Sequence, residues 1–339
     1  MRYNVGVRLS KSTLERRLVT IPALIAVAVT LTLTVPLWLP LTAVFDALRG
    51  RLRLPTVRLL AFGVCWAWLE TAGVLAALGL WISGQGRRQG LHYALQAWWA
   101  KNLLTALGAT CGIRLEVDNV EAFTPGPAVL FVRHASLADS LVSAFVTTNL
   151  AGLRPRYVLK RELLLDPCLD IVGQRIPNYF LDRATTDSAP ELAALERLTT
   201  GLGQLDIAII FPEGTRANPR KREKSLEKIA EHDPERARKL SALRNLLPPR
   251  PSGAAAMMRG APDVDVILAW HVGFEGLDTF GGILAALNRR PAPILFSARR
   301  VANSDVPRGR AFNEWLDRQW VRMDAEVGAA FASRHDNET

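Results

Sequence analysis

The sequence AVLFVRHASLADS, residues 128–140, combines a strand signal with two residues that suit proton transfer. Its four apolar residues, Val129 to Val132, are typical of a buried strand. His134 follows this run, and Asp139 lies five positions further on. Five helical positions would place the two side chains about 140° apart, so one regular helix cannot bring them together. The spacing therefore predicts His134 at the strand exit and Asp139 in the first turn of the next helix, with Ser136 as its N-cap.

A histidine beside a carboxylate is a candidate proton acceptor. The imidazole has a reference pKa of about 6.5, and a carboxylate on its second nitrogen would fix the tautomer and stabilise the imidazolium. The pair is weak evidence alone, because the chain has five histidines and many aspartates. A strand-end histidine and a helix-start aspartate without any chemical role remain an alternative at this point.

A second motif, FPEGTR at residues 211–216, follows another strand-like run, Ile207 to Ile210. Six specified residues in order are much less expected by chance than a histidine and an aspartate at one spacing. With both motifs present, the chain resembles the glycerolipid acyltransferase family, whose members are similar to lysophosphatidate (1-acylglycerol-3-phosphate) acyltransferase. The apolar run Tyr179 to Arg183 is similar to a further block of that family, and the resemblance extends over residues 98–301.

Two departures from the family pattern concern the acceptor. Arg133 precedes the histidine where an asparagine is common, and residues 264–269 lack the proline of the family's fourth block, although PPRPSG occurs at 248–253. The resemblance implies a membrane-bound enzyme that moves a fatty acyl group to the free hydroxyl of a lysophospholipid. The donor would be acyl-CoA or acyl-carrier protein as a co-substrate, with no other cofactor. The leading acceptor is 1-acylglycerol-3-phosphate, which would give phosphatidic acid in phospholipid biosynthesis.

The same resemblance assigns roles to individual residues. His134 would be the base and Asp139 its partner, while arginines would bind the substrate phosphate through their planar forks. Glu213 would hold a glycerol hydroxyl or Arg216, and Gly214 would let the backbone approach the ligand. The predicted substrate-binding residues are Arg183, Glu213, Gly214, Thr215 and Arg216.

Other functions have less support. The chain has no GxSxG, HExxH or GxxxxGK[ST] motif, which disfavours a serine esterase, a zinc protease and a P-loop enzyme. Its three cysteines, Cys65, Cys111 and Cys168, lack metal-ligand spacing, so we expect free thiols and no metal. Three alternatives remain: transfer to another lysophospholipid, a covalent route through Ser136 or Ser140, and a catalytically idle lipid-binding relative.

The N-terminal region has the composition of a membrane segment. Residues 1–17 are basic, residues 18–45 carry no charge, and residues 59–86 are interrupted only by Glu70. The first of these runs exceeds the ~20 apolar residues that cross a bilayer, and the second apolar run follows it closely. We therefore predict a membrane-embedded helical hairpin at 18–86. Pro22, Pro36 and Pro40 leave a kinked span and a re-entrant hairpin both open, and a cleaved signal peptide is the competing interpretation.

The rest of the chain predicts an α/β domain. Residues 87–112 indicate an interfacial helix with Trp98 and Trp99, and residues 113–339 alternate strand and helix signals. This alternation predicts a mixed sheet covered by helices. Strands are expected at 113–117, 129–132, 156–159, 207–211, 264–269 and 294–299, and a final helix at 311–331.

The charged insert at 216–250 has eleven Lys or Arg against five Asp or Glu. It contains no aromatic residue for base stacking, so a solvated helix pair beside anionic lipid is favoured over a nucleic-acid surface. The net charge of +10 suits anionic headgroups or thioester donors. We expect a membrane protein with its catalytic domain on the cytoplasmic side.

Overall fold

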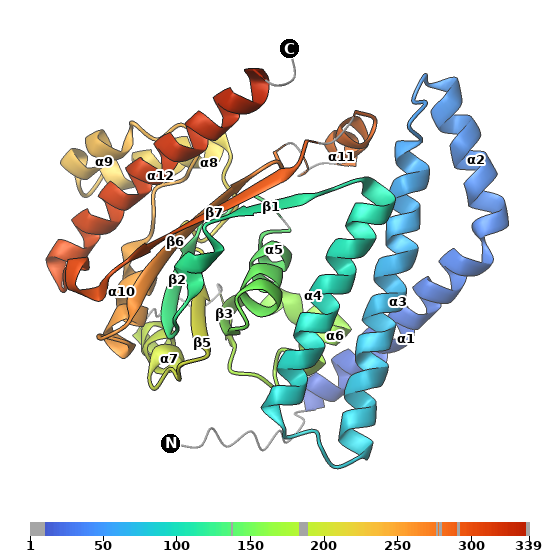
Figure 1. Ribbon diagram of the computed structural model, residues 1–339, viewed down its shortest axis with the longest axis horizontal. Helices are drawn as coiled ribbons and strands as arrows, with labels where there is room; N and C mark the ends of the chain where they lie inside the picture. Colours follow the sequence, from blue (N-terminus) through green and yellow to red (C-terminus); the bar gives the residue numbers. More distant parts are fainter. Residues whose placement is uncertain are drawn as a thin grey trace.

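The computed structural model describes residues 11–136, 138–182, 189–275, 277, 280–289 and 292–336. Within these residues a seven-stranded sheet has the order β1-β7-β6-β2-β5-β3-β4 (Figure 1). Every neighbouring pair is parallel except β6 and β7, which are antiparallel. The predicted mixed α/β sheet is therefore confirmed. Its strands are β1 (Leu115–Asp118), β2 (Ala128–Val132), β3 (Arg154–Lys160), β4 (Tyr179–Leu181), β5 (Asp206–Ile210), β6 (Asp265–Val272) and β7 (Ile294–Val301).

The central strand β2 is buried on both faces, which explains its unbroken apolar sequence. Val129 and Phe131 face a core that includes Trp320 of α12 (Arg310–Asp336). Helices α7 (Ala189–Thr199) and α10 (Pro251–Gly260) complete that side. The alternate residues of β2 face a second core formed with α4 (Gln89–Cys111) and α5 (Asp139–Phe145). Two helical layers thus enclose the sheet, as Figure 1 shows.

Four further helices belong to this domain. They are α6 (Pro167–Val172), α8 (Pro219–Ala230), α9 (Pro234–Leu240) and α11 (Phe280–Leu287). One of them, α9, contributes Leu240 to the first core. Helices α8 and α9 form the charged insert and pack against each other. Side-chain caps from Asn218 and Asp233 begin them, and α8 has no buried residue. The insert is a helix pair in which α8 is solvated, as its charge pattern predicts, whereas α9 buries Ala237 and Leu240.

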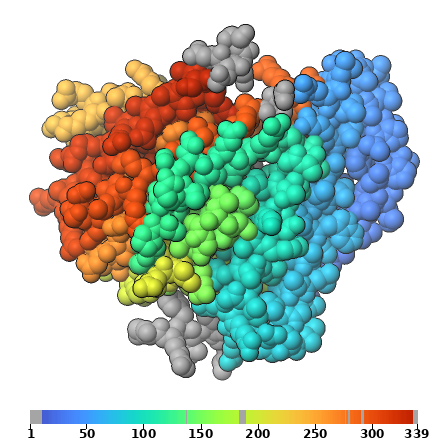
Figure 2. Space-filling model, viewed as in Figure 1, coloured from blue at the N-terminus to red at the C-terminus, as the bar shows by residue number. Residues whose placement is uncertain are grey.

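The N-terminal helices are α1 (Lys11–Leu33), α2 (Val35–Leu48) and α3 (Pro55–Ile82). The chain breaks between α1 and α2, where Pro36 occupies the first turn of α2. Helices α1 and α3 are each long and apolar enough to cross a membrane. They pack on each other through Leu24, Ala28 and Ala67, while other apolar side chains are exposed. In Figure 2 these helices, in blue, form one side of the molecule and α12, in red, lies on the other.

Three local expectations require correction. Ser136 is not the N-cap of α5, because the helix begins at Asp139 and its N-cap position, Ala138, provides no side-chain cap. The three-residue strand β4 was not predicted as a strand, since its length is below what alternation can reveal. Trp99 does not lie free at an interface: its indole Nε1 donates to Oε1 of Glu70 at 2.6 Å. Trp98 remains exposed.

Candidate active site

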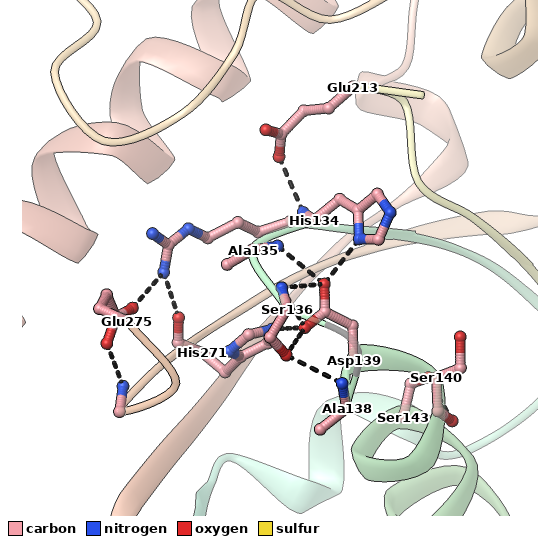
Figure 3. A network of polar contacts seen from close by, with 12 residues as sticks. His134, Ala135, Ser136, Ala138, Asp139, Ser140, Ser143, Glu213, His271 and Glu275 are labelled. Carbon is pink, nitrogen blue, oxygen red and sulfur yellow. Dashed lines mark hydrogen bonds and ion pairs between the residues drawn. The ribbon is translucent and has the colours of Figure 1, made fainter. Parts of the chain in front are cut away.

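The turn after β2 brings His134 and Asp139 together, as their spacing predicts. The β2–β6 pairing continues to Arg133, whose backbone N–H donates to the Ala269 carbonyl at 2.9 Å. His134 follows in the turn, and Asp139 is the first residue of α5. His134 Nδ1 lies 2.7 Å from Asp139 Oδ2 (Figure 3). An anionic carboxylate at this nitrogen requires the proton there, which leaves Nε2 free to accept one.

Asp139 is fixed by an unusually complete set of donors. Its carboxylate accepts from the backbone N–H of Ala135 at 2.7 Å and of Ser136 at 2.8 Å, and from the Ser136 hydroxyl. Burial alone would raise the pKa of this carboxyl. The imidazoles of His271 and His134 nevertheless hold the pKa of Asp139 well below its usual range. The carboxylate is therefore ionised at neutral pH and cannot rotate without losing several hydrogen bonds.

Ser136 has no free hydroxyl for a covalent route. Its Oγ donates to Asp139 and also accepts from the Ala138 backbone N–H at 3.0 Å. Both directions of hydrogen bonding are thus used within the turn (Figure 3). The arrangement makes Ser136 a support for Asp139 and weighs against its action as a nucleophile.

His271 is a site residue that the sequence analysis missed. It belongs to β6 and is fully buried, with Nε2 lying 3.0 Å from Asp139 Oδ1. The predicted strand ended at Ala269, two residues earlier. Ala269 pairs with Val132, so His271 continues alongside the catalytic turn. A histidine directly after an apolar strand was a visible signal, but only the strand register connects it with Asp139.

His134 is the accessible member of this group. Its side chain is 16% exposed, whereas that of Asp139 is 1% exposed. The ring packs against Phe211, with 4.9 Å between the ring centroids. The imidazole is therefore supported on one side and can meet a substrate on another. A buried carboxylate behind a partly open imidazole is the arrangement expected of a general base.

The FPEGTR turn holds the backbone of His134. Glu213 Oε1 accepts from the His134 N–H at 2.9 Å, and Oε2 accepts from the Leu247 N–H at 3.0 Å. The Ala217 N–H donates to the His134 carbonyl at 2.8 Å. Glu213 therefore binds backbone groups of the turn, and its expected role toward a glycerol hydroxyl or Arg216 stays a prediction. Burial raises the pKa of Glu213 to about 8.

The other predicted binding residues follow in the same turn. Gly214 has φ +68°, a conformation that favours glycine, so backbone conformation explains this residue. Thr215 Oγ1 accepts from Lys221 Nζ at 3.1 Å. Arg216 is half-buried and has no ion pair within the described part of the chain. Arg183 lies outside the described residues.

An apolar cavity of about 1080 Å³ reaches the catalytic turn at Ser136 and Ala138. Its walls include residues of α3, α4 and α11, among them Phe62 and Leu107, and the segments that follow β6 and precede β7. The lining is largely aliphatic and aromatic, which suits a hydrocarbon chain. Among the residues described, no cluster of His, Cys, Asp and Glu is arranged to hold a metal ion.

Comparison with known proteins identifies the domain. Residues 114–269 match the model of the family described as Acyltransferase. The chain carries an acyltransferase domain. His134, Asp139 and Arg216 lie within the matched residues of this acyltransferase domain, and His271 lies two residues beyond them.

The fold of the acyltransferase also has a solved counterpart. It is similar to the crystal structure of the 1-acyl-sn-glycerophosphate (LPA) acyltransferase PlsC from Thermotoga maritima, with a TM-score of 0.52 and 16% sequence identity. The similarity covers 81% of this chain and 98% of the other. At this identity the match shows a shared fold. A search of curated protein sequences finds no match.

Proposed function

We propose that this acyltransferase moves a fatty acyl group from a thioester donor to the free hydroxyl of a lysophospholipid, with 1-acylglycerol-3-phosphate the leading acceptor. The observation that carries the proposal is the His134–Asp139 pair, with 2.7 Å between Nδ1 and Oδ2 and the imidazole partly open. The family match of the domain and the printed activity of the similar PlsC structure support it.

The reaction follows from the protonation states of the pair. His134 Nε2 takes the proton of the acceptor hydroxyl as its oxygen attacks the thioester carbon. The C–S bond breaks, and the imidazolium returns the proton to the departing thiolate. Asp139 stays ionised throughout and stabilises the imidazolium. The proton and the acyl group are both accounted for without an enzyme-bound acyl intermediate.

The arginine of the FPEGTR turn supplies the proposed recognition of phosphate. Arg216 follows the residues that hold the His134 backbone, and Ala217 bonds directly to the His134 carbonyl. A guanidinium at this position suits a phosphate attached close to the reacting hydroxyl. In 1-acylglycerol-3-phosphate, two carbons and one oxygen separate that hydroxyl from phosphorus. By the family resemblance, Arg183 would serve the same phosphate.

The apolar surfaces of the chain fit a lipid substrate and a membrane location. The cavity beside the catalytic turn borders on α3 at Leu59 and Phe62, so an acyl chain could enter from the membrane side. Exposed apolar side chains on α1 and α2 include Leu18, Leu33 and Leu37. A catalytic domain on the cytoplasmic side would meet the thioester donors where they are made.

Membrane embedding gives a separate test. We expect alkaline carbonate to leave the protein in the membrane pellet, because α1 and α3 each exceed the length of a bilayer crossing. Immunoblots of pellet and supernatant measure the distribution, with a known peripheral protein as the control. Release of the full-length chain into the supernatant would refute an integral location.

The function itself is tested by an acceptor screen. Membranes containing the protein are incubated with a labelled acyl-CoA or acyl-carrier protein donor and a panel of acceptors that comprises lysophospholipids and monoacylglycerol. The products are identified by mass spectrometry. We expect phosphatidic acid from lysophosphatidate, absent from membranes that contain His134→Ala. Transfer only to acceptors without phosphate would overturn the role of Arg216. No transfer to any acceptor from either thioester donor would favour the idle lipid-binding relative.

A further inference from the structure

A second pocket, of about 440 Å³, adjoins the apolar cavity, with which it shares Phe274, Glu275 and Phe331. We call it the cationic pocket. It borders the turn at Ala135 and the FPEGTR motif at Arg216, and it extends to α8 and to the segment after α9. Five of its lining side chains are basic: Arg133, Arg216, Lys221, Arg222 and Arg244.

Four of these cations lack a carboxylate partner among the described residues. Glu275, which also lines the pocket, pairs with Arg133 at 3.2 Å. Lys221 Nζ donates to Thr215 Oγ1 and to the Arg216 carbonyl, and Arg222 donates to the Arg244 carbonyl, all of them neutral oxygens. Elsewhere the fold pairs arginines closely with aspartates, as in Arg236–Asp317 and Arg300–Asp265, each at 2.7 Å. The pocket therefore holds positive charge that no carboxylate of the described residues offsets, apart from Glu275 beside Arg133.

We propose that Lys221, Arg222 and Arg244 of the insert complete a subsite for a phosphate monoester, in which they act together with Arg216. This inference rests on the proposed function and deepens it, because it adds insert residues outside the FPEGTR motif. A monoester phosphate carries close to two negative charges and three acceptor oxygens at neutral pH. Several cations without a carboxylate partner match that doubly charged ligand better than they match a singly charged diester.

The position of the pocket favours the acceptor as the source of the phosphate. The pocket lies beside the backbone of His134. Ala135, the next residue, lines the pocket, and so does Ala217, whose N–H donates to the His134 carbonyl. A glycerophosphate carries its phosphate only a few bonds from the accepting hydroxyl. The phosphates of a CoA donor are separated from its thioester by the long pantetheine arm. We therefore assign the subsite to the headgroup of the lysophospholipid.

The test compares two double variants that each remove two positive charges from the insert. Lys221→Gln with Arg244→Gln changes the pocket, whereas Lys224→Gln with Lys228→Gln changes exposed residues of α8 that do not line it. We expect the pocket variant to raise the KM for lysophosphatidate about tenfold and to leave the KM for acyl-CoA within about twofold, as for lost hydrogen bonds to a charged ligand. The control variant should keep both constants near those of the wild type.

A binding measurement separates this inference from the proposed function. The melting temperature of the detergent-solubilised full chain is recorded with and without sn-glycerol 3-phosphate. We expect the ligand to raise the melting temperature of the wild type and the control variant, but not of the pocket variant. This readout applies even if lysophosphatidate proves not to be an acceptor. Equal losses in both variants, or a rise confined to the KM for acyl-CoA, would overturn the assignment.

A different observation carries a second inference, about His271. The carboxylate of Asp139 has one imidazole on each oxygen: His134 at 2.7 Å on Oδ2 and His271 at 3.0 Å on Oδ1. His271 is fully buried, and in the described part of the chain neither of its ring nitrogens makes a hydrogen bond of suitable geometry, so the 3.0 Å approach of Nε2 to Oδ1 is an electrostatic contact. Its carbonyl accepts from Arg133 Nη1, which fixes the backbone beside the turn.

The geometry points to His271 as a positioning residue for Asp139. It does not reach the surface, so it cannot touch the substrate. A proton on Nε2 would hold Oδ1 and thereby keep Oδ2 aimed at His134. Loss of this contact would leave Asp139 fewer restraints and a less uniform orientation. The consequence should appear in turnover and not in acceptor binding.

Two substitutions test this role. His271→Leu removes the contact, and His271→Gln can return an amide N–H near the position of Nε2. We expect the leucine variant to lower kcat about tenfold with little change in the KM for lysophosphatidate, and the glutamine variant to recover most of the loss. If the leucine variant does not fold, His271→Asn replaces it, because its amide is too short to reach Asp139. Unchanged kcat in a folded Leu or Asn variant, or no recovery with Gln, would overturn the inference.

Discussion

The catalytic turn and the cationic pocket lie next to each other. The charge of the turn is compensated by groups of the protein, whereas most of the charge of the pocket is not. In the turn, the single carboxylate of Asp139 receives donors from His134, Ala135 and Ser136, with His271 close to its other side. In the pocket, Arg216 and its basic neighbours have no carboxylate among the described residues except Glu275, which faces Arg133.

The two regions therefore suit two different functions, proton transfer in the turn and binding of a charged substrate in the pocket. A group that directs a proton must keep one orientation, so its charge is fixed by internal bonds. A group that binds a charged substrate must keep its charge available until the ligand arrives. Substitutions in the turn should therefore change kcat, and substitutions in the pocket should change the acceptor KM.

The largest expected effect comes from His134→Ala. General-base catalysis is typically worth about a hundred- to ten-thousand-fold, so kcat should fall by that order while the acceptor KM changes little. Turnover with lysophosphatidate measures the loss. His232→Ala is the matched control, because His232 is an exposed histidine of the insert. Retention of near-normal kcat in folded His134→Ala would reopen the covalent route through a serine.

Asp139→Asn should lower kcat almost as much. Every polar contact of Asp139 comes from a donor, so an amide NH₂ must face at least one of them. If it faces His134, it selects the wrong tautomer. Buried donors left facing each other should also lower the melting temperature. A variant with wild-type kcat and stability would contradict the donor arrangement described for the turn.

Arg216→Lys should affect binding more than turnover. Lysine keeps the charge but loses the bidentate fork, so we expect the KM for lysophosphatidate to rise about tenfold. The value of kcat should fall less, because the phosphate is present alike in ground and transition states. Initial rates over a range of acceptor concentrations separate the two constants. A fall in kcat without a rise in KM would show that Arg216 acts in turnover and not in binding the phosphate.

The smallest effect concerns Glu213, which joins the two regions. Burial raises its pKa to about 8, so the folded protein binds a proton that the unfolded chain releases near pH 4.5. Wild-type stability should therefore fall as pH rises from about 5 to 8. Glu213→Gln cannot titrate at this position. The melting temperature of the variant minus that of the wild type should therefore rise by a few degrees between about pH 5 and pH 8. A melting-temperature difference between the two proteins that stays constant from about pH 5 to pH 8 would contradict the raised pKa of Glu213.

Local sequence signals predicted much of the fold and the centre of the site. The apolar run at 129–132 predicted β2, and the five-residue spacing placed Asp139 at a helix start facing His134. These features depend on neighbouring residues, for which periodicity and side-chain direction are sufficient. The prolines likewise indicated the interruption now seen between α1 and α2.

Features that depend on tertiary register could not be predicted in this way. His271 reaches Asp139 only because β6 pairs with β2, and Glu213 reaches the Leu247 backbone only because the insert folds back on its turn. The charge of the insert was visible, but its gathering of Lys221 and Arg244 around one pocket with Arg216 was not. Each of these contacts joins elements that are distant in sequence.

The central claim, that the His134–Asp139 pair serves an acceptor held by its phosphate, is tested most directly by comparing two acceptors. The purified protein is given acyl-CoA with lysophosphatidate or with monoacylglycerol of the same acyl chain, and kcat/KM is measured for each. We predict a strong preference for lysophosphatidate, lost when the pocket variant is used and accompanied by loss of both activities in His134→Ala. Equal or greater kcat/KM for monoacylglycerol in the wild type would contradict the account.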